Sequence, residues 1–223
     1  MPHRYDVITF DCYGTLIDWE AGIADAFLGA ARADGRTLVR DAVLSAYAEI
    51  EPRVEAGGYR RYRDVLTDTA VEVARSLGWP LTRERAGFLA ESLPAWSAFP
   101  DTNPSLQALR DRGYRLGILS NVDDDLLAGT RKLLAVPFGV LVTAEQVRSY
   151  KPAHGHFLEA RTRLAGRRWL HAGQSHFHDV VPAAALGIPV VWVNRKGERP
   201  TGAARPDGEV KSLAGLVEWL DRS

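Results

Sequence analysis

Residues 7–17 read VITFDCYGTLI, and this stretch decides the fold of the chain. An apolar run that ends at a glycine turn is typical of a buried β-strand, here residues 7–10. Asp11 follows directly, at the edge of the sheet where α/β proteins bind their ligands. Burying a carboxylate is costly unless it is paired, hydrogen-bonded or catalytic. The sequence therefore predicts a functional Asp11 at the carboxyl end of the first strand.

The second half of the chain alternates between strands and helices. The strand-like runs are RLGILS (115–120), FGVLVT (138–143), WLHAG (169–173) and IPVVWVNR (188–195). Strands separated by helices of this length form parallel sheets with right-handed crossovers. We expect helices over residues 123–134, 177–186 and 211–220. A polar connection that contains Gly and Pro is expected over 196–208.

Residues 22–93 contain no clear strand signal and are typical of a series of amphipathic helices. Apolar side chains recur three and four positions apart along them, and the last helix is expected over residues 82–93. We predict an α/β core of residues 1–16 and 98–223, interrupted by an all-helical cap of residues 17–97. An apolar stripe left exposed on the cap would allow a homodimer.

Composition excludes several classes of protein. The 28 acidic and 28 basic side chains balance, whereas proteins that bind nucleic acid usually carry a basic excess. Cys12 is the only cysteine, which rules out an internal disulfide and favours a packed thiol in a reducing compartment. The residues MPHRYDV hold no apolar stretch long enough for a signal peptide, and no later run has the length of a membrane span. We expect a cytoplasmic protein without nucleic-acid or membrane partners.

Four short segments carry side chains suited to chemistry, and each follows an apolar strand or the loop that leaves it. They are DCYGT with Asp11, LSN with Ser120, YKP with Lys151, and AGQSHFHD with Asp179. The carboxyl ends of parallel strands lie along one edge of a sheet. We therefore expect these four side chains to converge.

In this order, the four segments resemble the four motifs of the haloacid dehalogenase superfamily, and in particular its 2-haloacid dehalogenase branch. The resemblance covers essentially the whole chain. It implies a Rossmann-like parallel sheet with a helical cap inserted after the first strand.

The chemistry of a carboxylate nucleophile suggests a role for each of five catalytic residues. Asp11 would form an ester with the substrate and must stay ionised, so it needs a nearby cation and hydrogen-bond donors. Lys151 is a suitable cation, and Thr15 and Ser120 supply hydroxyl donors. Asp179 is placed to take a proton from the water that attacks the ester.

Two substitutions separate the dehalogenase branch from the phosphatases of the superfamily. Tyr13 stands where phosphatases carry a second Asp that protonates the leaving alcohol, and a phenol titrates near 10. A halide leaves without a proton. Gln174 replaces an Asp that helps to hold magnesium in phosphatases, and a neutral amide binds this ion less well. The resemblance implies that no cofactor is required; a metal, if present, would be held by Asp11 and Asp179.

The resemblance also implies a small anionic substrate, a 2-haloalkanoic acid. Ser120, Asn121 and backbone amides would hold its carboxylate group. The other residues expected to line the binding site are Tyr13, Trp19, Gln174 and Ser175.

The sequence departs from the dehalogenase pattern in the cap, where these enzymes carry an arginine that helps to receive the halide. The matching position here is near Ala46. Arg53, Arg60, Arg61 or Arg63 could substitute from a neighbouring turn, although a solvated helix face explains the arginines at 60, 61 and 63 more simply.

Four histidines, at positions 154, 156, 176 and 178, form two H-x-H pairs near the last two motifs. At the start of a helix such a pair diverges by about 200°, so capping or surface roles are favoured over metal binding. Two other functions stay open. One is a magnesium-dependent phosphatase of small phosphomonoesters, and the other is a catalytically silent binder of small molecules on the same fold.

Overall fold

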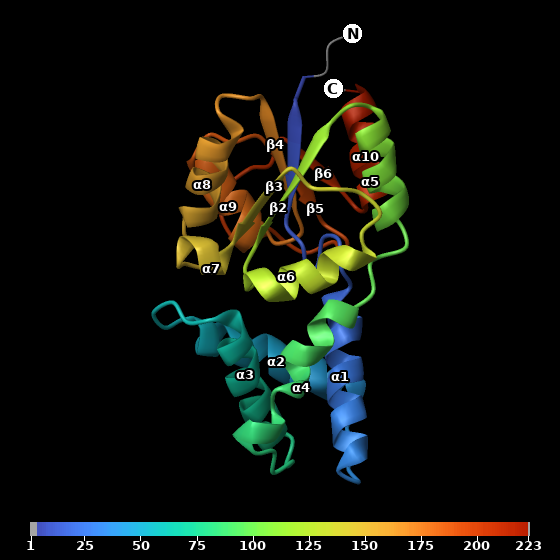
Figure 1. Ribbon diagram of the computed structural model, residues 1–223, viewed down its shortest axis with the longest axis vertical. Coiled ribbons are helices and arrows are strands. Elements are labelled where there is room, and N and C mark those ends of the chain that lie inside the picture. The colour runs from blue at the N-terminus through green and yellow to red at the C-terminus, as the bar shows by residue number, and fades with distance from the viewer. Residues whose placement is uncertain (1–3, 223) are drawn as a thin grey trace. The chain divides into compact units, whose positions relative to one another are not determined.

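The computed structural model describes residues 4–222 (Figure 1). Its central element is one parallel sheet in the order β3-β2-β1-β4-β5-β6. The strands are β1 (Val7–Phe10), β2 (Arg115–Ser120), β3 (Val140–Thr143), β4 (Trp169–Gly173), β5 (Val190–Val193) and β6 (Gly208–Val210). This sheet confirms the predicted α/β fold with a helical insert after the first strand.

The strands form where the sequence supplies runs of Val, Ile and Leu, because both faces of a parallel sheet are buried. β1 and β5 are buried along their whole length. Helices α5 and α10 pack against each other, and Figure 1 shows them on one side of the sheet with α8 and α9 on the other. The α-helices that accompany the sheet are α5 (Thr102–Asp111), α7 (Ala144–Val147), α8 (Gly155–Leu164), α9 (Val181–Ala185) and α10 (Leu213–Arg222).

The chain divides into two compact units. The α/β unit comprises the chain up to Asp18, Ala98–Asn121 and the chain from Leu133 on, and the helical unit comprises Trp19–Ser97 and Val122–Lys132. The α-helices of the helical unit are α1 (Trp19–Ala33), α2 (Arg40–Glu55), α3 (Tyr62–Ser76), α4 (Phe88–Ser92) and α6 (Asp124–Thr130). It also contains the 3₁₀ helices η1 (Arg83–Arg85) and η2 (Leu93–Ala95), and the 3₁₀ helix η3 (Arg131–Leu133) begins in it and ends at the first residue of the following α/β segment.

The segment 122–132 follows β2 in the chain and differs from the expected domain boundaries, which place it in the α/β core. It belongs to the helical unit because Asp123, which is fully buried, caps another helix there. Its carboxylate accepts the backbone N–H groups of Tyr62 and Arg63, each at 2.9 Å, at the start of α3. Helix α6 also packs against η2.

Three local features differ from the sequence-based expectations. The expected helix over 82–93 is interrupted between η1 and α4, where Gly87 has little helix propensity. The expected helix over 177–186 begins instead as a π-helical turn, η4 (His176–Val180), and continues as α9, whose Pro182 has no N–H to donate to the preceding turn. β6 was not expected, because its three residues GEV carry too little apolar pattern.

Among residues 4–222, no helix combines the length and the apolar character needed to cross a membrane.

Candidate active site

The first strand delivers Asp11 to the carboxyl edge of the sheet. The Asp11 N–H donates to the Ala172 carbonyl at 3.0 Å, which continues the pairing of β1 with β4 for one residue beyond the strand. The chain then turns sharply, with the Gly14 N–H donating to the Ile17 carbonyl at 2.8 Å. Gly14 has a φ of 98°, which only glycine adopts without strain. The turn therefore leaves the Asp11 carboxylate at the sheet edge, with the residue 8% exposed.

Each carboxylate oxygen of Asp11 has a hydrogen-bond donor. The Lys151 ammonium donates to Oδ1 at 2.9 Å, and the Thr15 hydroxyl donates to Oδ2 at 2.9 Å. The Thr15 hydroxyl also accepts the backbone N–H of Gln174 at 2.9 Å. An ionised carboxylate can only accept, so the single hydroxyl proton of Thr15 is directed at Asp11.

Lys151 joins the two acidic motifs. It is 1% exposed, and its three N–H groups donate to Asp11 Oδ1, to Asp179 Oδ1 at 2.6 Å and to the Leu119 carbonyl at 3.0 Å. The Asn121 side chain holds the lysine backbone, since Oδ1 accepts the Lys151 N–H at 2.7 Å and Nδ2 donates to the Lys151 carbonyl at 3.0 Å. Hydrogen bonds therefore fix both the backbone of Lys151 and the ammonium group at the end of its side chain.

Asp179 is fully buried and is also surrounded by donors. Its Oδ1 accepts from Lys151 and lies 3.3 Å from His171 Nε2, and its Oδ2 accepts the Ser175 N–H at 3.2 Å. Gly173 makes room for it: a Cβ at that position would lie 2.4 Å from Asp179 Cγ. The glycine of the fourth motif is thus required by close packing against the carboxylate.

The two carboxylates differ in proton affinity. Burial raises the pKa of Asp11, and the negative charge of Asp179 adds to this effect against the opposing influence of Lys151. Burial also acts to raise the pKa of Asp179, but the Lys151 charge and the His171 contact outweigh it and hold that pKa below its ordinary value. Its donors therefore keep Asp179 ionised, whereas the ionisation of the buried Asp11 depends on the Lys151 charge beside it.

Cys12 lies beside the nucleophile candidate but is inert. It is fully buried, and burial together with the charge of Asp11 holds the pKa of its thiol well above the ordinary value. Only a thiolate is strongly nucleophilic, so Cys12 behaves as the packed thiol that the sequence predicted.

Ser120 presents a buried hydroxyl to the candidate site. The residue is 1% exposed at the end of β2, and its Oγ has no hydrogen-bond partner among residues 4–222. Its carbonyl is held by His156 Nε2 at 3.0 Å. A buried hydroxyl without a partner costs free energy, which a bound ligand at this edge would recover.

Two other residues expected at the binding site are engaged by their neighbours. The Gln174 side-chain amide donates to Glu198 Oε2 at 3.2 Å, and Ser175 caps η4 by accepting the His178 N–H at 3.0 Å. Tyr13 is partly buried within the turn after β1. Trp19 belongs to the helical unit, where its ring centroid lies 5.9 Å from that of Tyr47.

The structure thus brings together Asp11, Thr15, Lys151 and Asp179, with Ser120 at the end of the adjacent strand. Sequence reasoning missed two residues around them. His171 contacts Asp179, and its signal was a lone histidine in the apolar run WLHAG. Arg195 donates from Nη2 to the Thr15 carbonyl at 2.8 Å, and its signal was a charged residue at the end of the last long strand.

The side chains at this edge do not fit a magnesium site. The Lys151 ammonium bridges the two carboxylates, and their remaining oxygens accept from Thr15 and Ser175. No group of three or more His, Cys, Asp or Glu side chains in the described part of the chain is placed to hold a metal ion. The four histidines of the H-x-H pairs do not gather either, since His156 contacts Ser120 and His176 contacts Thr201.

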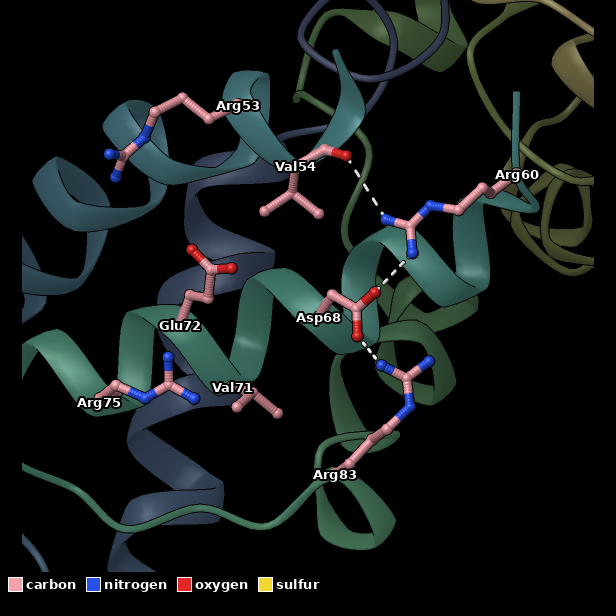
Figure 2. Close-up of a pocket in the computed structure, with 8 residues that line it drawn as sticks. All are labelled: Arg53, Val54, Arg60, Asp68, Val71, Glu72, Arg75 and Arg83. Atoms are coloured by element: carbon pink, nitrogen blue, oxygen red, sulfur yellow. Dashed lines mark hydrogen bonds and ion pairs between the residues drawn. The ribbon is translucent and has the colours of Figure 1, made fainter. Parts of the chain in front are cut away.

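Figure 2 shows a pocket of about 430 Å³ within the helical unit. Its lining residues are Arg53, Val54, Arg60, Asp68, Val71, Glu72, Arg75 and Arg83. Asp68 accepts from Arg60 at 2.6 Å and pairs with Arg83 through its other oxygen. Arg60 also donates to the Val54 carbonyl at 3.4 Å.

The remaining arginines named for the missing cap arginine are also paired with acids of the helical unit. Arg61 and Arg63 contact Asp125 at 3.4 and 2.6 Å, and Arg53 contacts Glu49 at 3.5 Å. All these arginines are more than one-third exposed. Their pairing supports the interpretation as a solvated helix face.

Comparison with known proteins identifies the family of the chain. The family model of the haloacid dehalogenase-like hydrolases matches residues 5–187. The chain is similar to the (S)-2-haloacid dehalogenase of Pseudomonas sp. (strain YL), with 29% identity over 226 residues. That match covers 96% of this chain and 94% of the relative.

Two solved structures have closely similar folds. The L-2-haloacid dehalogenase from Xanthobacter autotrophicus with chloropropionic acid covalently bound gives a TM-score of 0.84 at 18% identity, over 97% of this chain and 98% of that one. The hydrolase YfnB from Bacillus subtilis, bound to magnesium, gives 0.83 at 18% identity, over 98% of this chain and 99% of that one. At these identities the similarity establishes the shared fold.

Proposed function

The chain belongs to the haloacid dehalogenase-like hydrolases, and from this premise we propose that it hydrolyses the carbon–halogen bond of a small 2-haloalkanoic acid. The observation that carries the proposal is the Asp11 carboxylate, held between the Lys151 ammonium and the Thr15 hydroxyl at the carboxyl edge of the sheet. The relative in Pseudomonas sp. (strain YL) is named for action on such acids, and the Xanthobacter structure contains a covalently bound chloropropionic acid.

In the first step, an oxygen of Asp11 attacks the carbon that bears the halogen. A carbon–oxygen bond forms, the carbon–halogen bond breaks with inversion, and the halide leaves with the electron pair. No proton is needed, so Tyr13 does not have to act as an acid. Lys151 and Thr15 hold the carboxylate in the direction of attack, which lowers the entropic cost of the step.

In the second step, water attacks the ester carbonyl of Asp11. Asp179, which its donors keep ionised, accepts a proton from that water and passes it to the leaving alkoxide, so that a 2-hydroxy acid is released. The other proton of the water is lost when Asp11 returns to its carboxylate form. Esterification removes the charge of Asp11, so Lys151 then pairs with Asp179 alone and keeps it in place.

The substrate carboxylate requires donors beside Asp11. The Ser120 hydroxyl is suited to this role because it is buried and has no partner among the described residues. We assign Asn121 instead to holding the Lys151 backbone. Contributions of Tyr13, Trp19, Gln174 and Ser175 to substrate binding stay predictions.

The reaction as proposed needs no metal or other cofactor. The alternative is a phosphatase acting with magnesium. The chain shares its fold with the magnesium-bound Bacillus protein. The groups around Asp11 favour the dehalogenase over the phosphatase. An ammonium group bridges the two carboxylates, and a neutral amide stands at position 174.

The test is an assay of the purified protein treated with EDTA. It is offered 2-chloropropionate and chloroacetate, and an aliquot supplemented with magnesium is offered a set of phosphomonoesters. We expect chloride release that survives EDTA and is lost in Asp11→Asn, with Asp18→Asn as the matched control. Phosphate release that requires magnesium, without chloride release, would establish the phosphatase, and inactivity toward both sets would also contradict the proposal.

A further inference from the structure

His171 lies in the middle of β4, inside the α/β unit. The sheet register places it directly opposite Thr9 of β1, and both residues are fully buried. Trp169 precedes His171 by two residues, so its side chain lies on the same face of the sheet. Gly117 lies opposite Thr9 on the other neighbouring strand, where a Cβ would come within 3.1 Å of Thr9 Cγ2. The register and this glycine together fix the position of the threonine beside the histidine.

Hydrogen bonds connect these three side chains in a row. Trp169 Nε1 donates to Thr9 Oγ1 at 2.6 Å, and Thr9 Oγ1 lies 2.9 Å from His171 Nδ1. An indole N–H can only donate, so the threonine oxygen is an acceptor in the first bond. Among the described residues, Thr9 Oγ1 has no hydrogen-bond partner besides Trp169 and His171, so its hydroxyl proton is directed at His171 Nδ1, which must be unprotonated to accept it. The neutral imidazole consequently carries its proton on Nε2.

The other end of the row is the second carboxylate of the candidate site. His171 Nε2 lies 3.3 Å from Asp179 Oδ1, the oxygen that also accepts from Lys151. Phe157 of α8 packs edge-to-face against the imidazole with a centroid separation of 5.1 Å, which restrains the ring. The Nε2 proton therefore points at Asp179 from the interior of the sheet.

We propose that His171 is a positioning residue for Asp179, with its proton-bearing nitrogen selected by Thr9 and Trp169. The inference rests on the proposed function and deepens it. Esterification of Asp11 removes one of the two anions that hold Lys151, and the lysine and Asp179 could then shift. The bond from His171 to Asp179 does not involve Asp11, so it still holds Asp179 at that stage. Hydrolysis of the ester depends on the hydrogen bond from His171 to Asp179, whereas formation of the ester does not.

Two substitutions of His171 separate the loss of the imidazole ring from the loss of the hydrogen-bond donor to Asp179. In His171→Gln the amide nitrogen replaces Nε2 and keeps a donor for Asp179. In His171→Asn the amide reaches only the position of Nδ1, so Asp179 loses its donor. Losing one hydrogen bond to a charged group corresponds to a loss of about 10- to 100-fold in rate. We expect that loss in kcat of His171→Asn, with KM falling equally, kcat/KM unchanged, and the Asp11 ester accumulating in intact-mass spectra.

His171→Gln should retain most of the activity, and the matched control His154→Gln, at an exposed histidine, should be indistinguishable from the parent protein. Equal loss in both His171 variants, or a fall in kcat/KM without ester, would show that the histidine only supports the fold. Thermal unfolding measured alongside detects variants that fail to fold.

A second measurement needs no substrate and so separates this inference from the proposed function. Long-range ¹H–¹⁵N NMR spectra of the ligand-free protein report which imidazole nitrogen of His171 carries the proton. We expect protonation at Nε2 in the parent protein and in Thr9→Ser, and loss of that preference in Thr9→Val. A proton on Nδ1 in the parent protein, or an unchanged spectrum in Thr9→Val, would overturn the inference even if halide release were established.

Discussion

At the scale of the residue, one ammonium group organises the candidate site. Lys151 donates to two carboxylates that burial alone would make reluctant to ionise, and its own pKa is raised because their charges outweigh the effect of burial. The sequence could predict that these residues meet, because each follows a strand of one parallel sheet. It could not predict the role of Asn121 or His171, since their partners depend on loop conformation and strand register.

His156 gives a prediction about pH. Burial and the nearby Lys151 charge lower its pKa to about 3, so the folded protein holds a neutral imidazole where the unfolded chain titrates near 6.5. Its contribution to stability is complete above about pH 6.5 and is lost as the pH falls toward 3. The free energy of unfolding should drop by about 1.4 kcal/mol per pH unit across that interval from this group alone.

The measurement is urea unfolding at about pH 7.5 and pH 5 for the parent protein and for His156→Gln, in which the amide can still donate to the Ser120 carbonyl. The drop between the two pH values should be about 2 kcal/mol smaller in the variant. His154→Gln serves as the control. An equal drop in the parent and His156→Gln would show that the imidazole is protonated in the folded protein.

At the scale of the element, the strands followed from apolar runs, and the exceptions have local causes. β6 is short, and its pairing with β5 depends on tertiary contact rather than on its own composition. The π-helical turn η4 depends on Ser175 and Pro182 at its two ends, a combination that helix periodicity does not reveal. The order of the four motifs nevertheless gave the place of each candidate catalytic residue.

The junction of β4 and η4 gives a prediction about packing. In Gly173→Ala the new methyl group would overlap the Asp179 side chain, so the carboxylate must move from Lys151 and Ser175. We expect a loss of stability of about 1–3 kcal/mol, typical of overpacking, and at least a tenfold loss of whichever hydrolytic activity is found. Thermal unfolding and the assay measure both. Gly202→Ala, where the methyl group meets open space, should change neither.

The start of α3 gives a prediction about capping. Asp123→Ala removes the acceptor of two backbone N–H groups and should lower the free energy of unfolding by about 1–3 kcal/mol. Asp64→Asn, in the first turn of the same helix, removes a similar charge without removing those bonds. A similar loss in both variants would assign the effect to charge at the helix terminus and not to capping.

At the scale of the whole molecule, the sheet topology explains why the site lies beside β1. The chain runs from β1 through β2 to β3 on one side, and then returns to β4 on the other side of β1. Such a reversal opens a crevice at the carboxyl ends of the two central strands, and ligands bind there in open α/β sheets. Asp11 directly follows β1, Gly173 is the last residue of β4, and Gln174 follows it.

The division into two units gives a prediction about excision of the insert. Its ends are close together, since Ile17 forms a bridge with Ala98 and the Phe99 N–H donates to the Leu16 carbonyl at 3.1 Å. A short Gly-Ser linker can therefore replace residues 19–97. We expect the product to bind the dye ANS and to exchange the amide protons of α6 rapidly, because α6 loses its packing partners. Slow exchange at α6 would show that it folds with the sheet alone.

The burial of Lys151 has a consequence for chemical labelling. All three of its donors are used inside the protein, so the amine has neither the access nor the free electron pair that acylating reagents require. Peptide mapping after brief treatment with acetic anhydride should find Lys196 and Lys211 modified and Lys151 spared. Acetylation of Lys151 would therefore require the buried site to open, and the rate of acetylation would measure how often it opens.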